Sequence, residues 1–154
     1  MLPSAPIHVV IVDDDPEDCE LFKLALEQSP VPVALQILYD GESLLRQLSN
    51  NDSLPDAIFL DINMPKKSGR EVLAEIRSNK KFNDVRIIMF STSASVDDID
   101  YSYDHGANLY IPKSVFFSDQ KNILKTLFSD EWEKYLVQVP KEIFVLNNVH
   151  SPEL

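Results

Sequence analysis

Residues 7–15 have the sequence IHVVIVDDD, an apolar run that ends in three acids. A short run that is apolar almost throughout, rather than at every second position, indicates a strand buried on both faces, here over residues 7–12. The third acid, Asp15, precedes Pro16, and this order is typical of the N-cap and first residue of a helix. The stretch therefore predicts a buried strand that leads directly into a helix.

The same strand-then-helix unit recurs along the rest of the chain. Further strands are predicted at residues 33–38, 57–60, 86–90 and 108–111. A helical pattern follows each of them; the second helix opens at Asp40-Gly41, and the last helical region covers about 117–137 with a break near 129–130. Apolar strands that alternate with helices form a parallel sheet covered by helices on both faces.

Several residues mark where the helices begin and end. Ser68 with Glu71, and Ser95 with Asp98, have the spacing of a capping box. Gly106 is suited to end the fourth helix in the left-handed conformation. Pro140 is expected to end the last helical region.

The composition indicates one acidic domain. The chain has 154 residues, which suits a single domain over 1–154, with a core over about 5–137 and a short tail over 138–154. The net charge of −11 argues against binding nucleic acid or an anionic membrane through bulk charge.

No apolar run approaches the roughly 20 residues that span a bilayer. The single cysteine excludes an intrachain disulfide and, with no secretory signal, predicts a cytoplasmic location.

Polar side chains follow four of the predicted strands. They are Asp13 and Asp14 after the first, Asp61 after the third, Ser91 and Thr92 after the fourth, and Lys113 after the fifth. Ligand sites in parallel sheets lie at the carboxyl ends of the strands, near the point where the strand order reverses, so these groups should lie together. Each residue type is common at a strand end, but convergence from four loops indicates a functional site.

Three neighbouring carboxylates repel one another and need a cation or a raised pKa to coexist. Oxygen ligands without histidine or cysteine suit Mg²⁺, with Mn²⁺ as the other option, and the three histidines are too scattered for a zinc site. A carboxylate can also accept a phosphoryl group to form an acyl phosphate. Asp61 is the predicted acceptor because it ends the central strand, between the acidic pair and Lys113.

Four short runs resemble the signatures of response-regulator receiver domains. They are VDDD (12–15), LDINMP (60–65), STS (91–93) and YIPKS (110–114). The resemblance covers about residues 5–137 and implies a flavodoxin-like, doubly wound α/β fold, with a five-stranded parallel sheet in the order 2-1-3-4-5 and five helices. Two further features resemble the stand-alone regulators that partner bacterial phytochrome-type histidine kinases. They are the pair Lys66-Lys67 and the presence of Ser114 where most receivers have proline.

The resemblance also implies roles for individual residues. Asp61 matches the phosphorylated aspartate, Asp13 and Asp14 the acidic pair that binds Mg²⁺ with it, Asn63 the residue whose backbone carbonyl is a further metal ligand, Lys113 the lysine that pairs with the phosphoryl oxygens, and Ser91 and Tyr110 the switch residues. Thr92 follows Ser91 directly, and either hydroxyl is a candidate to hydrogen-bond a phosphoryl oxygen.

These assignments predict a signalling protein rather than an enzyme with a separate substrate. It would take a phosphoryl group from a histidine kinase or a histidine phosphotransfer protein, and Tyr110 would then turn inward. The change would reach the face built from the fourth helix, fifth strand and fifth helix, which would bind a target or form a homodimer. The alternatives are an unphosphorylated receiver-like scaffold and a phosphatase with an aspartyl-phosphate intermediate. The phosphatase fits less well. Such enzymes have a DxD motif after the first strand, whereas here the candidate nucleophile Asp61 follows the third strand as DxN.

Overall fold

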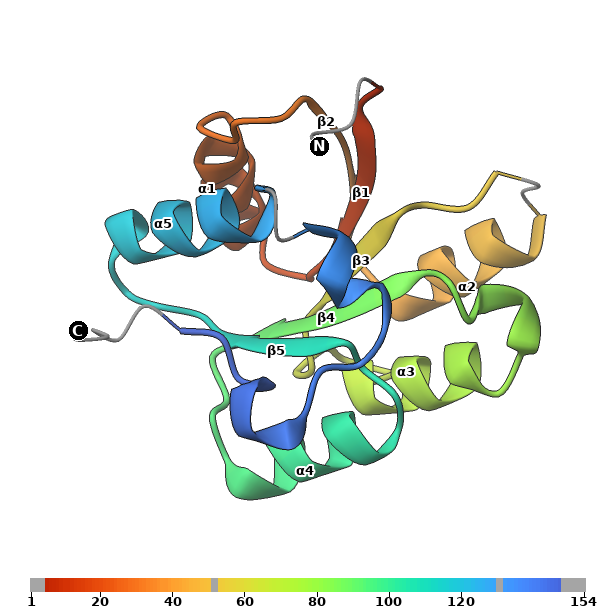
Figure 1. Cartoon of the computed structure of the whole chain (residues 1–154). Helices are drawn as coiled ribbons and strands as arrows, with labels where there is room; N and C mark the ends of the chain where they lie inside the picture. Colours follow the sequence, from red (N-terminus) through yellow and green to blue (C-terminus); the bar gives the residue numbers. More distant parts are fainter. Residues whose placement is uncertain (1–4, 51–52, 130–131, 148–154) are drawn as a thin grey trace.

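Strand-then-helix units succeed one another in the part of the chain that the structure describes, which is residues 5–50, 53–129 and 132–147 of a computed structural model (Figure 1). The strands are β1 (Ile7–Val12), β2 (Val33–Leu38), β3 (Ala57–Leu60), β4 (Arg86–Ser91) and β5 (Leu109–Pro112). The helices are α1 (Pro16–Leu26), α2 (Gly41–Asn50), α3 (Gly69–Arg77), α4 (Val96–Asp104) and α5 (Phe117–Leu127). Short 3-10 helices cover Lys80–Phe82, Trp132–Leu136 and Lys141–Ile143. Within these described ranges, no helix combines the length and the apolar character needed to cross a membrane.

The strands are all parallel and pair in the order β2-β1-β3-β4-β5. The predicted flavodoxin-like fold is therefore confirmed. Helices α1 and α5 lie together on one face of the sheet, and α2, α3 and α4 lie on the other (Figure 1). The strand order reverses between β1 and β3, and in sheets of this kind the loops at the carboxyl ends of such strands form the ligand site.

The central strands are buried because helices cover both of their faces. Every residue of β3 and β4 is buried, as their continuous apolar runs predict. On the α1 side of the sheet, the rings of Phe22, Phe59 and Phe90 pack with centroids 4.7, 5.5 and 6.2 Å apart. Burial of one such side chain contributes about 1.5–3 kcal/mol, so this cluster anchors α1 to the two strands that flank the site.

The helix termini follow the predicted local chemistry. Asp15 accepts a hydrogen bond from the second residue of α1, and Pro16 is the first residue of that helix. Ser68 and Glu71 form the complete capping box of α3, with each side chain bonded to the other residue's backbone N–H. Gly106 has φ of +89° and follows α4 in the left-handed conformation.

The capping box predicted for α4 is only half formed. Ser95 accepts a hydrogen bond from the Asp98 backbone N–H at 3.1 Å. The Asp98 carboxylate, however, pairs with Arg70 of α3 at 3.2 Å and accepts from the Ser93 hydroxyl at 2.5 Å instead of returning to Ser95. The Ser95 N–H donates to the Ser93 hydroxyl oxygen at 3.4 Å, so Ser93 and Arg70 together replace the second half of the capping box.

The chain after α5 departs from the prediction. The break in the last helical region is present, since α5 ends at Leu127, although residues 130–131 lie outside the described part. Residues 138–147, which we call the C-terminal segment, then return along β5, where Val145 bridges in parallel with Tyr110 and Phe144 is fully buried. The packed chain thus extends beyond the predicted limit at residue 137, because an edge strand offers unpaired backbone groups that a further segment can satisfy.

Candidate functional site

Three acids meet at the carboxyl ends of β1 and β3. Oxygen atoms of the Asp13, Asp14 and Asp61 carboxylates all lie within 4.8 Å of one another. Asp13 and Asp61 are buried, whereas Asp14 is exposed. Because Val12 lies opposite Leu60 in the register of the two strands, the residue after each strand reaches the same place. The structure therefore brings together the three acids that the sequence singled out.

The ammonium group of Lys113 lies inside this acidic cluster. Its Nζ atom is 2.6 Å from Asp13 Oδ2, 2.8 Å from Asp18 Oδ2 and 3.6 Å from Asp61 Oδ2. Burial opposes the charged form of the lysine, but its hydrogen bonds to Asp13 and Asp18 outweigh this effect and raise the pKa of Lys113. The lysine is thus a fixed positive charge beside Asp61.

Asp18 is a member of the cluster that the sequence analysis missed. It lies in the first turn of α1, where an acid is commonly explained by the helix dipole. Its partner Lys113 is 95 residues away in the chain. The one sequence signal was that α1 starts directly from the acidic loop, which points its first turn toward the same edge of the sheet.

The Asp61 carboxyl sits where its ionised form is disfavoured. Burial raises the pKa of Asp61, and the charge of Asp13 adds to this effect. Lys113 and the hydroxyl of Ser91 act in the opposite direction without cancelling it. A divalent cation at the cluster would favour the ionised form, because an adjacent positive charge offsets both burial and carboxylate repulsion.

The donor set fits a hard divalent cation. Carboxylate oxygens are the ligands that Mg²⁺ and Mn²⁺ prefer, and the acidic cluster, defined over the described residues, includes no histidine or cysteine. The exposure of Asp14 leaves one side open to solvent, which suits Mg²⁺ because this ion keeps several of its waters. Asn63 lies in the same loop, two residues after Asp61, and its carbonyl as a ligand stays a prediction.

The structure separates the two candidate switch hydroxyls. Ser91, the last residue of β4, is fully buried, and its hydroxyl lowers the pKa of Asp61 without cancelling the larger effect of burial. Its Oγ atom also accepts a hydrogen bond from the Ser93 backbone N–H at 3.2 Å. Thr92 is exposed. Ser91 is therefore the hydroxyl that lies beside the acidic cluster.

A family model of the response regulator receiver domain matches residues 9–127 of the chain. The chain belongs to this family. Response regulator Rcp1 of Synechocystis sp. is 36% identical to this receiver over 116 residues, which are 72% of this chain and 79% of Rcp1.

Two solved structures support the same relationship. The phosphorylated cyanobacterial phytochrome response regulator RcpA matches this receiver with a TM-score of 0.75 and 38% identity, covering 83% of this chain and 94% of that one. The Mn²⁺-bound form of Rcp1 matches with a TM-score of 0.74 and 32% identity, covering 88% of this chain and 99% of that one. The predicted likeness to stand-alone phytochrome response regulators is confirmed.

Tyr110 of this receiver already points inward. Its side chain is fully buried, and its hydroxyl donates a hydrogen bond to the Ser93 carbonyl at 2.7 Å. The sequence predicts the inward position only as a consequence of phosphorylation. The structure differs from that expectation, because the bond to Ser93 already stabilises the buried ring.

The loop after Asp61 packs closely against the start of α3. A Cβ atom at Gly69 would lie only 2.1 Å from the Asp61 carbonyl oxygen, so no larger residue fits there without a shift of the backbone. Within the loop, Lys66 has φ of 69°, in the left-handed region. Glycine at position 69 therefore allows the receiver to hold the backbone of the predicted acceptor against a helix.

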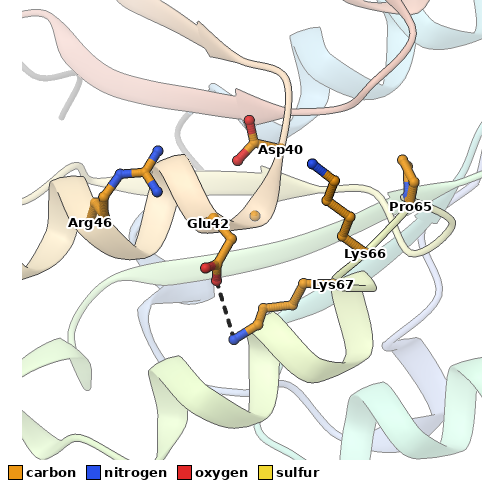
Figure 2. Close-up of a pocket in the computed structure, with 7 residues that line it drawn as sticks. Asp40, Glu42, Arg46, Pro65, Lys66 and Lys67 are labelled. Atoms are coloured by element: carbon orange, nitrogen blue, oxygen red, sulfur yellow. Dashed lines mark ion pairs between the residues drawn. The ribbon is translucent and has the colours of Figure 1, made fainter.

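A polar hollow lies beside this loop (Figure 2). Its lining residues are Asp40, Gly41, Glu42, Arg46, Pro65, Lys66 and Lys67. Figure 2 shows Lys67 reaching Glu42, an ion pair of 3.3 Å, and Lys67 also lies 2.8 Å from Glu75. The lining thus has three basic and two acidic residues, and its Lys67 is already paired with Glu42 and with Glu75 outside the hollow.

Proposed function

We propose that this receiver accepts a phosphoryl group on Asp61 from a histidine kinase or a histidine phosphotransfer protein in the cytoplasm, with Mg²⁺ or alternatively Mn²⁺ bound. The observation that carries the proposal is the convergence of three carboxylates with the buried Lys113 at the reversal of strand order. Relatives described as phosphorylated and as Mn²⁺-bound support both parts of it.

Asp61 is the nucleophile in this proposal. One of its oxygens attacks the phosphorus of a phosphohistidine, so that the new O–P bond forms as the N–P bond breaks and the imidazole keeps the electron pair. Lys113, 3.6 Å from Asp61 Oδ2, stabilises the negative charge on the phosphoryl oxygens. A divalent ion held by the acidic pair, Asp61 and the Asn63 carbonyl would offset the remaining charge and orient the group.

Ser91 carries the effect of the transfer to the rest of the molecule. Its hydroxyl favours the ionised form of Asp61 and, once Asp61 is phosphorylated, would donate its hydrogen bond to a phosphoryl oxygen instead. Its neighbour Ser93 is bonded through its carbonyl to Tyr110. A hydrogen bond from Ser91 to the phosphoryl group would therefore act on the loop between β4 and α4. Water later hydrolyses the acyl phosphate, which restores the Asp61 carboxylate and releases inorganic phosphate.

The output is binding of a target, and the face built from α4, β5 and α5 is its proposed surface. The C-terminal segment already covers part of that face, since it pairs with β5 and its Lys141 forms an ion pair of 2.7 Å with Asp100 of α4. A homodimer through the same face would have to form over this segment.

Incubation with radiolabelled acetyl phosphate and Mg²⁺ tests the proposal. The unaltered chain should take up label that hydroxylamine removes, as expected for an acyl phosphate, and Asp61→Asn should take up none. Asp97→Asn, which alters an exposed acid of α4, is the matched control and should be labelled like the unaltered chain. A chain without Asp61-dependent label would instead be a scaffold, and steady release of phosphate from small phosphate esters would indicate a phosphatase.

A further inference from the structure

The C-terminal segment is joined to the backbone of Tyr110. The Tyr110 N–H donates to the Phe144 carbonyl at 3.1 Å, and the Leu146 N–H donates to the Tyr110 carbonyl at 2.9 Å. Both backbone polar groups of Tyr110 are thus bonded to the segment. Figure 1 shows this part of the chain in dark blue, returning past β5 and α4.

Side chains of the segment also cover Tyr110 from outside. Phe144 is fully buried, with its ring centroid 6.5 Å from that of Tyr110 and 5.0 Å from that of Tyr103 on α4. The Tyr110 ring is itself fully buried beneath this cover. An outward swing of the tyrosine would therefore require Phe144 to leave its position.

Contacts with α4 and with Ala107, which follows that helix, hold the segment in this position. The Gln138 side-chain amide donates to the backbone carbonyls of Tyr103 and Ala107, both at 2.7 Å. Lys141 pairs with Asp100 at 2.7 Å. These two polar anchors lie on the exposed side of the segment, so they can be removed without opening the core.

On its inner side, Tyr110 leads toward the acidic cluster. The tyrosine hydroxyl donates to the Ser93 carbonyl, and the Ser93 N–H donates to the Ser91 hydroxyl oxygen. Ser91 is the last residue of β4, which pairs in parallel with β3 up to Leu60, the residue before Asp61. Hydrogen bonds therefore connect the C-terminal segment, through one buried tyrosine, to the strand end beside the predicted phosphoryl acceptor.

We propose that the C-terminal segment is a positioning element for the phosphoryl site. By covering Tyr110 it keeps the tyrosine hydroxyl on Ser93, and this contact keeps Ser91 where a phosphoryl group on Asp61 can receive its hydrogen bond. The inference rests on the proposed function. Coupling between two sites is reciprocal: if a docked segment favours the phosphoryl group, the phosphoryl group stabilises the docked segment by the same factor.

The test uses beryllofluoride with Mg²⁺ as a phosphoryl mimic on the full chain. The double variant Gln138→Ala/Lys141→Ala should bind beryllofluoride about fivefold or more weakly than the unaltered chain, as is typical of coupled sites. In the unaltered chain, beryllofluoride should slow hydrogen exchange of the Leu146 amide. Phe144→Ala should weaken binding further, and Phe144→Leu, which retains an apolar cover, should restore most of it.

A control separates positioning from general stability. Leu48→Ala removes a fully buried side chain from α2, away from the segment, and should lower the free energy of unfolding without weakening beryllofluoride binding. The two variants are compared under conditions in which urea denaturation gives them the same free energy of unfolding. If Leu48→Ala and Phe144→Ala then weaken beryllofluoride binding equally, the inference is overturned. Unchanged binding in the double variant despite faster Leu146 exchange would also overturn it. Failure of the unaltered chain to bind beryllofluoride would instead overturn the proposed function.

Discussion

At the scale of single residues, the burial of Asp61 and the charges around it affect the free energy of unfolding. Asp13 and Asp61 are both buried, and Lys113 lies closer to Asp13 than to Asp61, at 2.6 against 3.6 Å. A carboxyl whose pKa is raised on folding destabilises the fold in its ionised form. The predicted acceptor is thus maintained at some cost in stability, which a bound cation would reduce.

The variant Asp61→Asn should have a higher free energy of unfolding than the unaltered chain when divalent ions are removed. The gain should be largest above the raised pKa of Asp61, where the folded chain has to keep the buried carboxyl ionised. As the pH falls through the raised pKa of Asp61 toward its ordinary value, the folded chain takes up the proton and the difference should disappear. Urea denaturation with a chelator, repeated over this pH range, measures the difference in free energy of unfolding between the two chains. A difference that does not change with pH would contradict the raised pKa of Asp61.

The two neighbouring hydroxyls give a second prediction at this scale. Ser91→Ala should weaken beryllofluoride binding by about tenfold, since one hydrogen bond to a charged group is lost. Thr92→Ala should bind as the unaltered chain does, because Thr92 is exposed. Titration followed by a change in NMR chemical shifts distinguishes the two, and a larger effect of Thr92→Ala would transfer the switch role to that residue.

At the scale of elements, the start of α3 is built around the acceptor. The capping box of Ser68 and Glu71 fixes where the helix begins. Gly69, the first helical residue, then lies against the carbonyl of Asp61. Glycine is a poor helix former, so its presence in α3 is explained by this close approach rather than by helix propensity.

Gly69→Ala should destabilise the chain although alanine favours helices. We expect a loss of about 1–3 kcal/mol, because the added Cβ forces the loop away from α3. Acetyl phosphate labelling of Asp61 should fall with it, since the acceptor backbone is displaced. Ser68→Ala is the comparison variant and should cost about 1 kcal/mol through loss of the cap, with labelling retained. Equal labelling of the two variants would show that the loop tolerates the displacement.

At the scale of the whole molecule, Asn108 ties the C-terminal part of the chain to the sheet. Its side-chain oxygen accepts from the Ile87 N–H of β4 and from Arg77 of α3, both at 2.8 Å. Its amide donates to the carbonyl of Tyr135, in the 3-10 helix before the C-terminal segment, at 2.9 Å. One buried side chain therefore connects three elements that are distant in sequence.

Asn108→Ala should lower the free energy of unfolding by about 3 kcal/mol, because it leaves buried donors and an acceptor unpaired. Asn108→Asp keeps the acceptor oxygen beside Arg77 but places a carboxylate oxygen against the carbonyls of Tyr135 and Leu136, so it should also lower the free energy of unfolding. Both variants should speed amide exchange in residues 138–147, which hydrogen-exchange mass spectrometry can detect. Unchanged exchange there would show that the segment docks independently of Asn108.

The sequence by itself determined the architecture and singled out Asp13, Asp14, Asp61 and Lys113, which meet at the candidate site. Buried strands were visible as apolar runs, and caps such as Ser68 with Glu71 depend on residues a few positions apart. Asp13, Asp61 and Lys113 could be placed together because every strand of a parallel sheet ends at the same edge. These features follow from local periodicity and turn chemistry, which neighbouring residues encode.

Only the tertiary structure decided which partner each polar group takes. Asp18 binds Lys113, Asp98 binds Arg70 rather than completing its cap, and Ser91 is buried whereas Thr92 is exposed. It also decided that residues 138–147 pair with β5. Such choices depend on contacts between residues far apart in the chain, where several partners compete for one charge or one strand edge. Proximity, burial and geometry select among them, and none of these is present in the order of the residues.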